Sequence, residues 1–99
     1  MGVKLSSEES ELYKRCDEVL FYLWDPIGVS DQPYARDEYH SYLPQAFQLV
    51  RSNATADQIA SYLAGVEKDR MGSESQPDHN RKVAEVLLEW RLRIFEDAA

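Results

Sequence analysis

The sequence predicts an all-α fold, a compact four-helix domain that occupies the whole of residues 1–99. Apolar residues recur at spacings of three and four in four separate stretches, which is typical of helices with one buried face. No stretch alternates apolar and polar residues between turn signals, as a half-buried strand would. The connections are short enough to join antiparallel neighbours, and there is no internal repeat.

The composition is that of one ordinary globular domain, with 43% apolar and 29% charged residues. No segment approaches the roughly 18 consecutive apolar residues of a membrane span, and no signal-peptide pattern is visible. Cys16 is the single cysteine, so no internal disulfide can form, and its helical spacing from Leu12 and Val19 predicts a buried thiol. We therefore expect a cytoplasmic protein stabilised by packing.

The net charge of −7 favours basic proteins as partners and disfavours nucleic acids and anionic membranes, which would be repelled. The charge is uneven, because residues 1–50 contain four basic and nine acidic side chains, whereas residues 51–99 contain seven and nine. The most acidic surface should therefore lie in the first half of the chain.

The first helix is predicted over residues 7–24. Ser6 and Glu9 have the spacing of a capping box, and Pro26 ends the helix. Trp24 widens the apolar face, which consists of Leu12, Cys16, Val19, Leu20 and Leu23.

The turn after this helix contains residues that restrict or free the backbone. Asp25 precedes a proline and is pushed out of the helical region, and Gly28 can adopt a positive φ. Ile27 and Val29 are apolar, so we expect them to pack in the corner between two helices.

The second helix is predicted over residues 33–52, with Pro33 at its start and the acids Asp37 and Glu38 near its positive end. Pro44 interrupts the pattern, because it removes a hydrogen bond and crowds the carbonyl of His40. We expect a kink at Pro44, with a break into two short helices as the alternative.

The third and fourth helices are predicted over residues 56–71 and 79–96. Thr55 and Gln58 form a second capping-box pair, and Gly72 is a plausible stop. The apolar face of the third helix consists of Ile59, Tyr62, Leu63 and Val66. The fourth has two adjacent stripes, one of Val83, Val86, Leu87, Trp90 and Ile94, and one of Ala84, Leu88 and Phe95.

Two motifs carry a resemblance to a known family. The WDPIGV turn at residues 24–29 and the DEY helix start at 37–39 are similar to those of small uncharacterised bacterial helical proteins, a domain of unknown function. The likeness extends more loosely through residues 70–72 and 83–90. The resemblance implies a helical bacterial protein and implies no catalytic residue.

Enzyme signatures are absent from the sequence, which has no phosphate loop, dinucleotide fingerprint, HExxH or paired CxxC. We therefore expect no catalytic residue, metal or cofactor. The alternative is a metal-binding or acid/base site of Asp37, Glu38 and His40, since residues three apart can share a helix face. The competing interpretation is an ordinary helix start with favourable acids and an exposed histidine.

The predicted function is a non-catalytic protein-interaction domain, such as an acidic inhibitor or immunity-type partner of a basic protein. Aromatic anchors among acids are typical of interfaces, and here they are Trp24, Asp25, Asp31, Tyr34, Asp37, Glu38 and Tyr39. Trp24 could instead be a core residue and Asp25 a brace of the turn. The alternative function is a structural homo-oligomer, a dimer that buries Trp90, Ile94 and Phe95 of the fourth helix.

Overall fold

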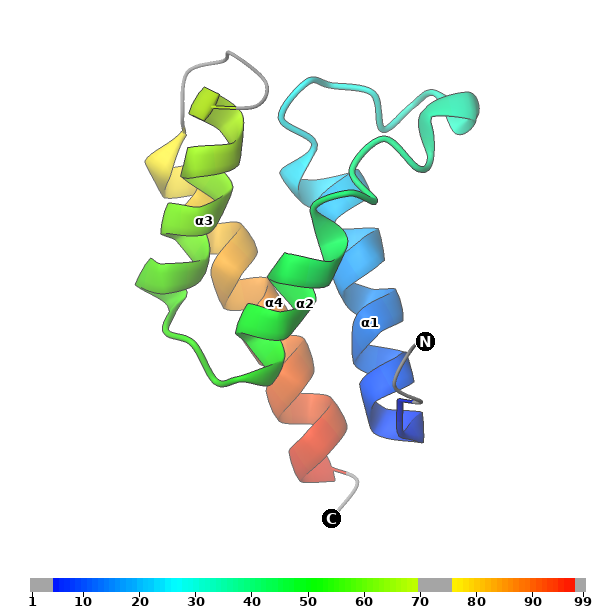
Figure 1. Cartoon of the computed structure of the whole chain (residues 1–99), viewed down its shortest axis with the longest axis vertical. Coiled ribbons are helices and arrows are strands. Elements are labelled where there is room, and N and C mark those ends of the chain that lie inside the picture. The colour runs from blue at the N-terminus through cyan, green and yellow to red at the C-terminus, as the bar shows by residue number, and fades with distance from the viewer. Residues whose placement is uncertain (1–4, 70–75, 98–99) are drawn as a thin grey trace.

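The computed structural model describes residues 5–69 and 76–97, and within them it contains four α-helices and no strand. The predicted all-α fold is therefore confirmed (Figure 1). The helices are α1 (Ser7–Val19), α2 (Leu43–Arg51), α3 (Ala56–Asp69) and α4 (Pro77–Asp97). None of these helices is long and apolar enough to cross a membrane.

Both predicted capping boxes are formed. The Glu9 N–H donates to Ser6 Oγ at 3.1 Å, and the Ser6 N–H donates to Glu9 Oε1 at 3.0 Å. The same reciprocal pair joins Thr55 and Gln58, at 3.1 and 2.8 Å. Each box satisfies backbone donors that have no partner inside the helix, so these two sequence patterns fix where α1 and α3 begin.

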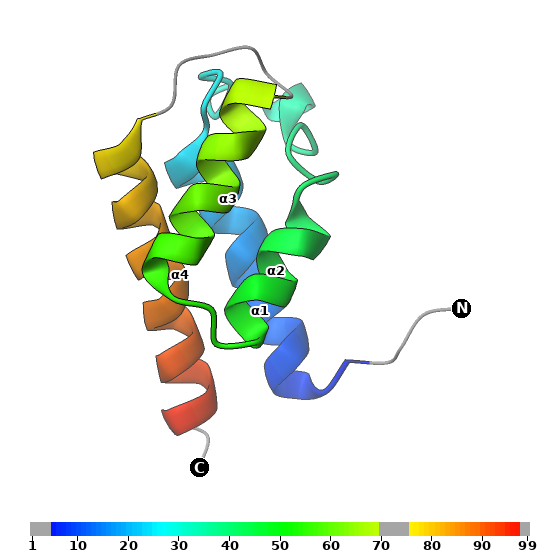
Figure 2. The ribbon, with the colours of Figure 1, turned by 60° about the vertical axis from the view of Figure 1, so that its left-hand side comes forward.

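The core lies where α4 packs against both α1 and α3. Helix α2 also packs against α1 and α3, on the side of these two helices opposite α4 (Figures 1 and 2). Cys16 is fully buried there, as its spacing predicted, and burial raises the pKa of its thiol to about 12. The largest side chains with almost no exposed surface include Trp24, Tyr39, Leu12, Leu20, Ile59, Leu63 and Leu87.

The first helix does not remain α-helical to its end, because residues Leu20–Trp24 form a π-helical segment, η1. The Asp25 N–H donates to the Leu20 carbonyl, five residues back, at 3.0 Å. The wider turn rotates the following side chains relative to the α-helical register. As a result Phe21 is buried, and Leu23, expected in the core, is 40% exposed.

The predicted second helix over residues 33–52 is wrong in its first half. Pro33–Ala35 form one 3₁₀ turn, η2, and residues 36–42 are a series of turns with i to i+3 bonds. Pro44 has no N–H to donate to the His40 carbonyl, which instead accepts the Leu43 N–H at 3.3 Å. Pro44 thus lies in the first turn of α2, where proline is tolerated, and does not kink a longer helix.

The last two helices differ from prediction only at their ends. The described part of α3 ends at Asp69, and the predicted stop at Gly72 lies outside the described residues. Helix α4 begins at Pro77, two residues before the predicted start, because proline fits the first helical position. Val83, Ala84 and Leu87 of the predicted stripes are buried, and the other stripe residues pack against the core half-buried.

One end of the molecule collects several chain segments. The loop of residues 25–42, here called the corner loop, projects at the end where η1 and α3 finish and α4 begins (Figure 1). The last turns of α4 lie at the other end. The corner loop contains all the predicted partner-binding residues except Trp24. Its conformation therefore determines which of them are exposed.

Candidate protein-binding surface at the corner loop

Asp25 fixes the start of the corner loop. It adopts the left-handed conformation, with φ 36° and ψ 60°, and Gly28 follows with the positive φ expected for it, 69°. The Asp25 carboxylate accepts the Val29 N–H at 2.8 Å, the Ser30 N–H at 3.1 Å and the Tyr39 hydroxyl at 2.7 Å. Asp25 therefore braces the turn from within and does not face a partner.

The electrostatics of Asp25 follow from these bonds. Burial alone would raise the pKa of this carboxyl, but the hydrogen bonds from Tyr39, Val29 and Ser30 stabilise the carboxylate more strongly and lower it. Burial and the bond to Asp25 raise the pKa of the Tyr39 phenol. The Tyr39 oxygen also accepts the Ile27 N–H at 3.3 Å, so one phenol connects both sides of the loop.

Trp24 anchors the corner in the core. Its indole N–H donates to Glu67 Oε2 at 3.1 Å, and Glu67 Oε1 accepts the Asn80 amide at 2.9 Å and the Gln76 N–H at 3.4 Å. Glu67 and Asn80 are both buried. This network joins the end of η1 to α3 and α4 through groups whose loss would leave polar atoms in the interior.

Sequence reasoning missed this network, although a signal existed. Glu67 lies four residues after Leu63 and one after Val66, and therefore belongs to the apolar face of α3. A glutamate at a core position needs hydrogen-bond donors nearby. The indole of Trp24 and the amide of Asn80 supply them.

A second contact closes the end of the first helix. His79, in the first turn of α4, places Nε2 2.8 Å from the Leu23 carbonyl and 3.3 Å from the Trp24 carbonyl. Both carbonyls lie at a helix end, where no amide of the same helix is available. A protonated Nε2 donates to them, so His79 caps η1 from another helix.

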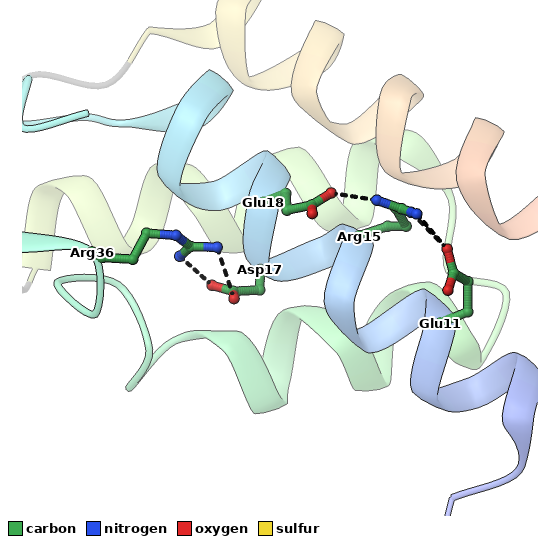
Figure 3. A network of polar contacts seen from close by, with 5 residues as sticks. All are labelled: Glu11, Arg15, Asp17, Glu18 and Arg36. Atoms are coloured by element: carbon green, nitrogen blue, oxygen red, sulfur yellow. Dashed lines mark hydrogen bonds and ion pairs between the residues drawn. The ribbon is translucent and has the colours of Figure 1, made fainter. Parts of the chain in front are cut away.

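The middle of the corner loop is tied to α1 by charge. Arg36 forms a two-bond ion pair with Asp17, at 2.9 and 3.0 Å, and its guanidinium lies 5.0 Å from the Phe21 ring centre (Figure 3). His40 Nε2 lies 3.1 Å from the same Asp17 carboxylate. Bidentate pairing fixes orientation as well as distance, so this contact holds the loop against the helix.

The arrangement does not support the metal or acid/base hypothesis for Asp37, Glu38 and His40. The imidazole of His40 pairs with Asp17 of α1 and not with its neighbour Asp37. Across residues 5–69 and 76–97, no group of three or more His, Cys, Asp or Glu side chains has the geometry to hold a metal ion.

The predicted partner-binding residues separate into two groups. Trp24 and Tyr39 are only 1% and 2% exposed, so their inclusion in a contact surface was wrong, because both aromatics fill the interior of the corner. Asp25 is turned inward. The four that face solvent are Asp31, Tyr34, Asp37 and Glu38, and Tyr34 is 83% exposed.

Three exposed apolar side chains were not predicted at this surface. Tyr22 is 60% exposed, Leu23 40% and Ile27 45%. Ile27 was expected to pack in the corner, but only Val29 of that pair packs against the core. With Tyr34, these account for four of the five large apolar side chains that are exposed in the described part of the chain.

The exposed acids of the corner loop differ from the paired acids of α1. Asp31, Asp37 and Glu38 form no ion pair with any of the described residues, whereas Glu11 and Glu18 of α1 are both paired with Arg15 (Figure 3). Their negative charge is consequently available to an incoming molecule. The corner loop and the adjoining η1 therefore contain both exposed apolar side chains and carboxylates without an ion pair among the described residues.

No protein-family model, curated protein or solved structure matches the chain.

Proposed function

We propose that this chain is a non-catalytic protein-interaction domain that binds a positively charged protein through the corner loop and the adjoining end of η1. The observation that supports the proposal is that this short stretch of chain contains the exposed side chains Tyr22, Leu23, Ile27 and Tyr34 together with Asp31, Asp37 and Glu38, which form no ion pair within the described residues. An inhibitor or immunity-type role in the bacterial cytoplasm fits this chemistry.

The two kinds of side chain have different tasks in such an interface. Tyr34 and Tyr22 supply large, rigid apolar area whose burial gives most of the affinity. The carboxylates of Asp37 and Glu38 attract a basic partner over about 10 Å at 0.1 M salt, which speeds encounter. Association should therefore slow as salt rises, while dissociation depends mainly on the apolar anchors.

The loop is also organised before binding. Asp25 fixes its start, the Arg36–Asp17 ion pair fixes its middle, and Tyr39 fills the space beneath it. A surface already held in one conformation loses less entropy on association than a free loop does. Pre-organisation of this kind favours recognition of one partner shape.

The test compares two charge-neutralised variants on an immobilised chain exposed to an extract of the source organism. D37N/E38Q removes two exposed acids of the corner loop. E8Q/E96Q removes the same charge at the opposite end of the molecule, from acids that form no ion pair within the described residues. We expect the wild type and E8Q/E96Q to retain one basic protein. D37N/E38Q should retain at least tenfold less of that protein.

A third variant, Tyr34→Ser, should weaken retention mainly by faster dissociation, because it removes an apolar anchor and no charge. Equal retention by all variants, or binding that is indifferent to salt, would show that the corner loop is not the docking surface. The gene beside this one should encode the basic partner if the role is immunity.

A homodimer through α4 is the second candidate, supported by apolar surface at the other end of the molecule. Leu92 is 48% exposed, Trp90, Ile94 and Phe95 are half-buried, and a groove of about 420 Å³ runs beside Trp90. Sedimentation equilibrium of the wild type and Leu92→Ser tests it. A dimer that the substitution dissociates would support this candidate, and a monomer at all concentrations would exclude it.

A further inference from the structure

A groove separates the start of α2 from α3, next to the corner loop. It encloses about 440 Å³. Tyr42, at the end of the corner loop, and Gln45 of α2 form one wall, and residues of α3 form the other. The Tyr62 hydroxyl donates to the Tyr42 carbonyl at 3.1 Å, which joins the two walls at one point. The residues of α3 that line it include Ser61, Tyr62, Gly65 and Asp69.

Gly65 is the unusual residue of this groove. It lies inside the α-helix α3, without a positive φ, at a position where glycine is less stable than alanine. A Cβ added to Gly65 would have no atom within 4 Å. Neither the backbone conformation nor the packing at this position therefore requires glycine. Because Gly65 has no side chain, the space beside it in the groove stays open.

The lining chemistry favours a cation. Tyr42, Tyr62 and the exposed residue Asp69 line the groove, and none of its described lining residues is lysine or arginine. Aromatic faces and carboxylates both attract a guanidinium, which is planar and stacks on rings.

The groove adjoins the end of the corner loop. Tyr42 closes the corner loop and its ring centre lies 6.3 Å from that of the anchoring Trp24. Ser41, the preceding loop residue, also lines the groove. A long side chain of a protein that covers this end of the corner loop would lie beside the groove.

We propose that this groove binds the guanidinium of an arginine side chain of the protein partner, and that Gly65 keeps the space for it open. The inference rests on the proposed function, because it assigns a specific pocket to the basic partner of the corner loop. The guanidinium stacks on the tyrosine rings and pairs with Asp69, while the amide of Gln45 and the hydroxyl of Ser61 provide further polar contacts.

The first experiment titrates the ¹⁵N-labelled full chain with Nα-acetyl-arginine amide and follows amide resonances by NMR. The control ligand is Nα-acetyl-citrulline amide, which has nearly the same shape without the charge. We expect saturable shifts at Ser61 and Gly65 with the arginine derivative, in the millimolar range, and at least fivefold weaker binding of the citrulline derivative. Equal binding of both, or no saturable shift, would overturn the proposal.

The second experiment uses Gly65→Ala, with Asp69→Asn as a separate variant. Gly65→Ala should raise the melting temperature by roughly 2–8 °C, because alanine is the better helix former, and yet weaken arginine binding at least fivefold, followed at Ser61. Asp69→Asn should weaken binding without filling the groove. Unchanged arginine binding in both variants would contradict the assignment.

The two proposals fail differently in these measurements. If Gly65→Ala retains the captured basic protein at wild-type level while D37N/E38Q loses it, the groove assignment is wrong and the docking surface stands. If no captured protein depends on Asp37 and Glu38, the proposed function is wrong, whatever the groove binds. Gly28, in the corner loop, gives a separate glycine resonance that reports on that surface.

Discussion

The helical body and the corner loop differ in how far their acidic side chains are paired with arginine. On the helices, arginines pair with many of the acids, as where Arg15 binds Glu11 and Glu18, and Arg93 binds Glu89, although Glu8 and Glu96 form no ion pair within the described residues. In the corner loop, the one arginine, Arg36, pairs with Asp17 of α1 and leaves Asp31, Asp37 and Glu38 exposed. The comparison shows that the exposed acids of the corner loop are without an ion pair among the described residues, whereas many acids of the helices are paired with arginine.

The two regions also differ in what stabilises them. The body has regular i to i+4 hydrogen bonds and an apolar core, so many residues contribute to its stability. The corner loop has i to i+3 turns, and its shape depends on Trp24, Asp25 and the Arg36–Asp17 pair. Substitutions should therefore act at few positions in the loop, and each one tests the comparison.

The largest effect is expected at the tryptophan that joins the two regions. Trp24→Ala should lower the free energy of unfolding by about 3–5 kcal/mol, because it leaves a cavity and removes the indole donor from the buried Glu67 carboxylate. Trp90→Ala is the matched control, since Trp90 is half-buried and makes a cation–π contact with Arg15. In urea unfolding, Trp90→Ala should lower the free energy of unfolding by less than half as much as Trp24→Ala does. Equal losses would mean that the Trp24 network adds nothing beyond apolar burial.

Asp25 should rank second. Asp25→Ala removes the acceptor of three hydrogen bonds and replaces a residue that tolerates the left-handed conformation. We expect a loss of about 2–3 kcal/mol in urea unfolding. Asp31→Ala, an exposed acid in the same loop, should change stability by less than about 0.5 kcal/mol. A small loss at Asp25 would show that the loop is held by its packing alone.

The structural features that the sequence predicted correctly are those that depend on residues close together in the chain. The starts of α1 and α3 are local patterns, since Ser6 with Glu9 and Thr55 with Gln58 lie three residues apart and bond as predicted. The positive φ of Gly28 is local too. Such features need no knowledge of what the rest of the chain does.

The errors arose where distant residues decide the outcome. The exposure of Leu23 follows from the π-helical turn, and the burial of Trp24 depends on Glu67, 43 residues away. Residues 36–42 carry a helical pattern, yet Arg36 bonds to Asp17 on α1 and the loop stays a series of turns. Exposure of the predicted contact residues could therefore not be read from spacing alone.

The pH dependence separates the charge of Asp25 from its position. Its pKa is lowered in the folded state, so it contributes stability that is present above about pH 4, the ordinary value, and is lost as pH falls through the lower folded value. Asp25→Asn cannot ionise. The difference in unfolding free energy between wild type and Asp25→Asn should thus be largest above about pH 4 and shrink in more acidic buffer. A difference that is constant with pH would assign the role of Asp25 to shape alone.

The smallest expected effect concerns the tie between the corner loop and α1. Arg36→Met should cost only about 0.5–1 kcal/mol in urea unfolding, because the pair with Asp17 is partly exposed and screened by solvent. Its local effect should be larger, since the amides of Glu38, His40 and Tyr42 form the i to i+3 bonds of the loop and should exchange hydrogen faster, while those of α3 do not. Arg93→Met, which removes an exposed pair on α4, should leave loop exchange unchanged. If Arg36→Met also left it unchanged, the loop would be held by Asp25 and Tyr39 without help from the ion pair, and salt would then alter partner binding only through the acids on its outer face.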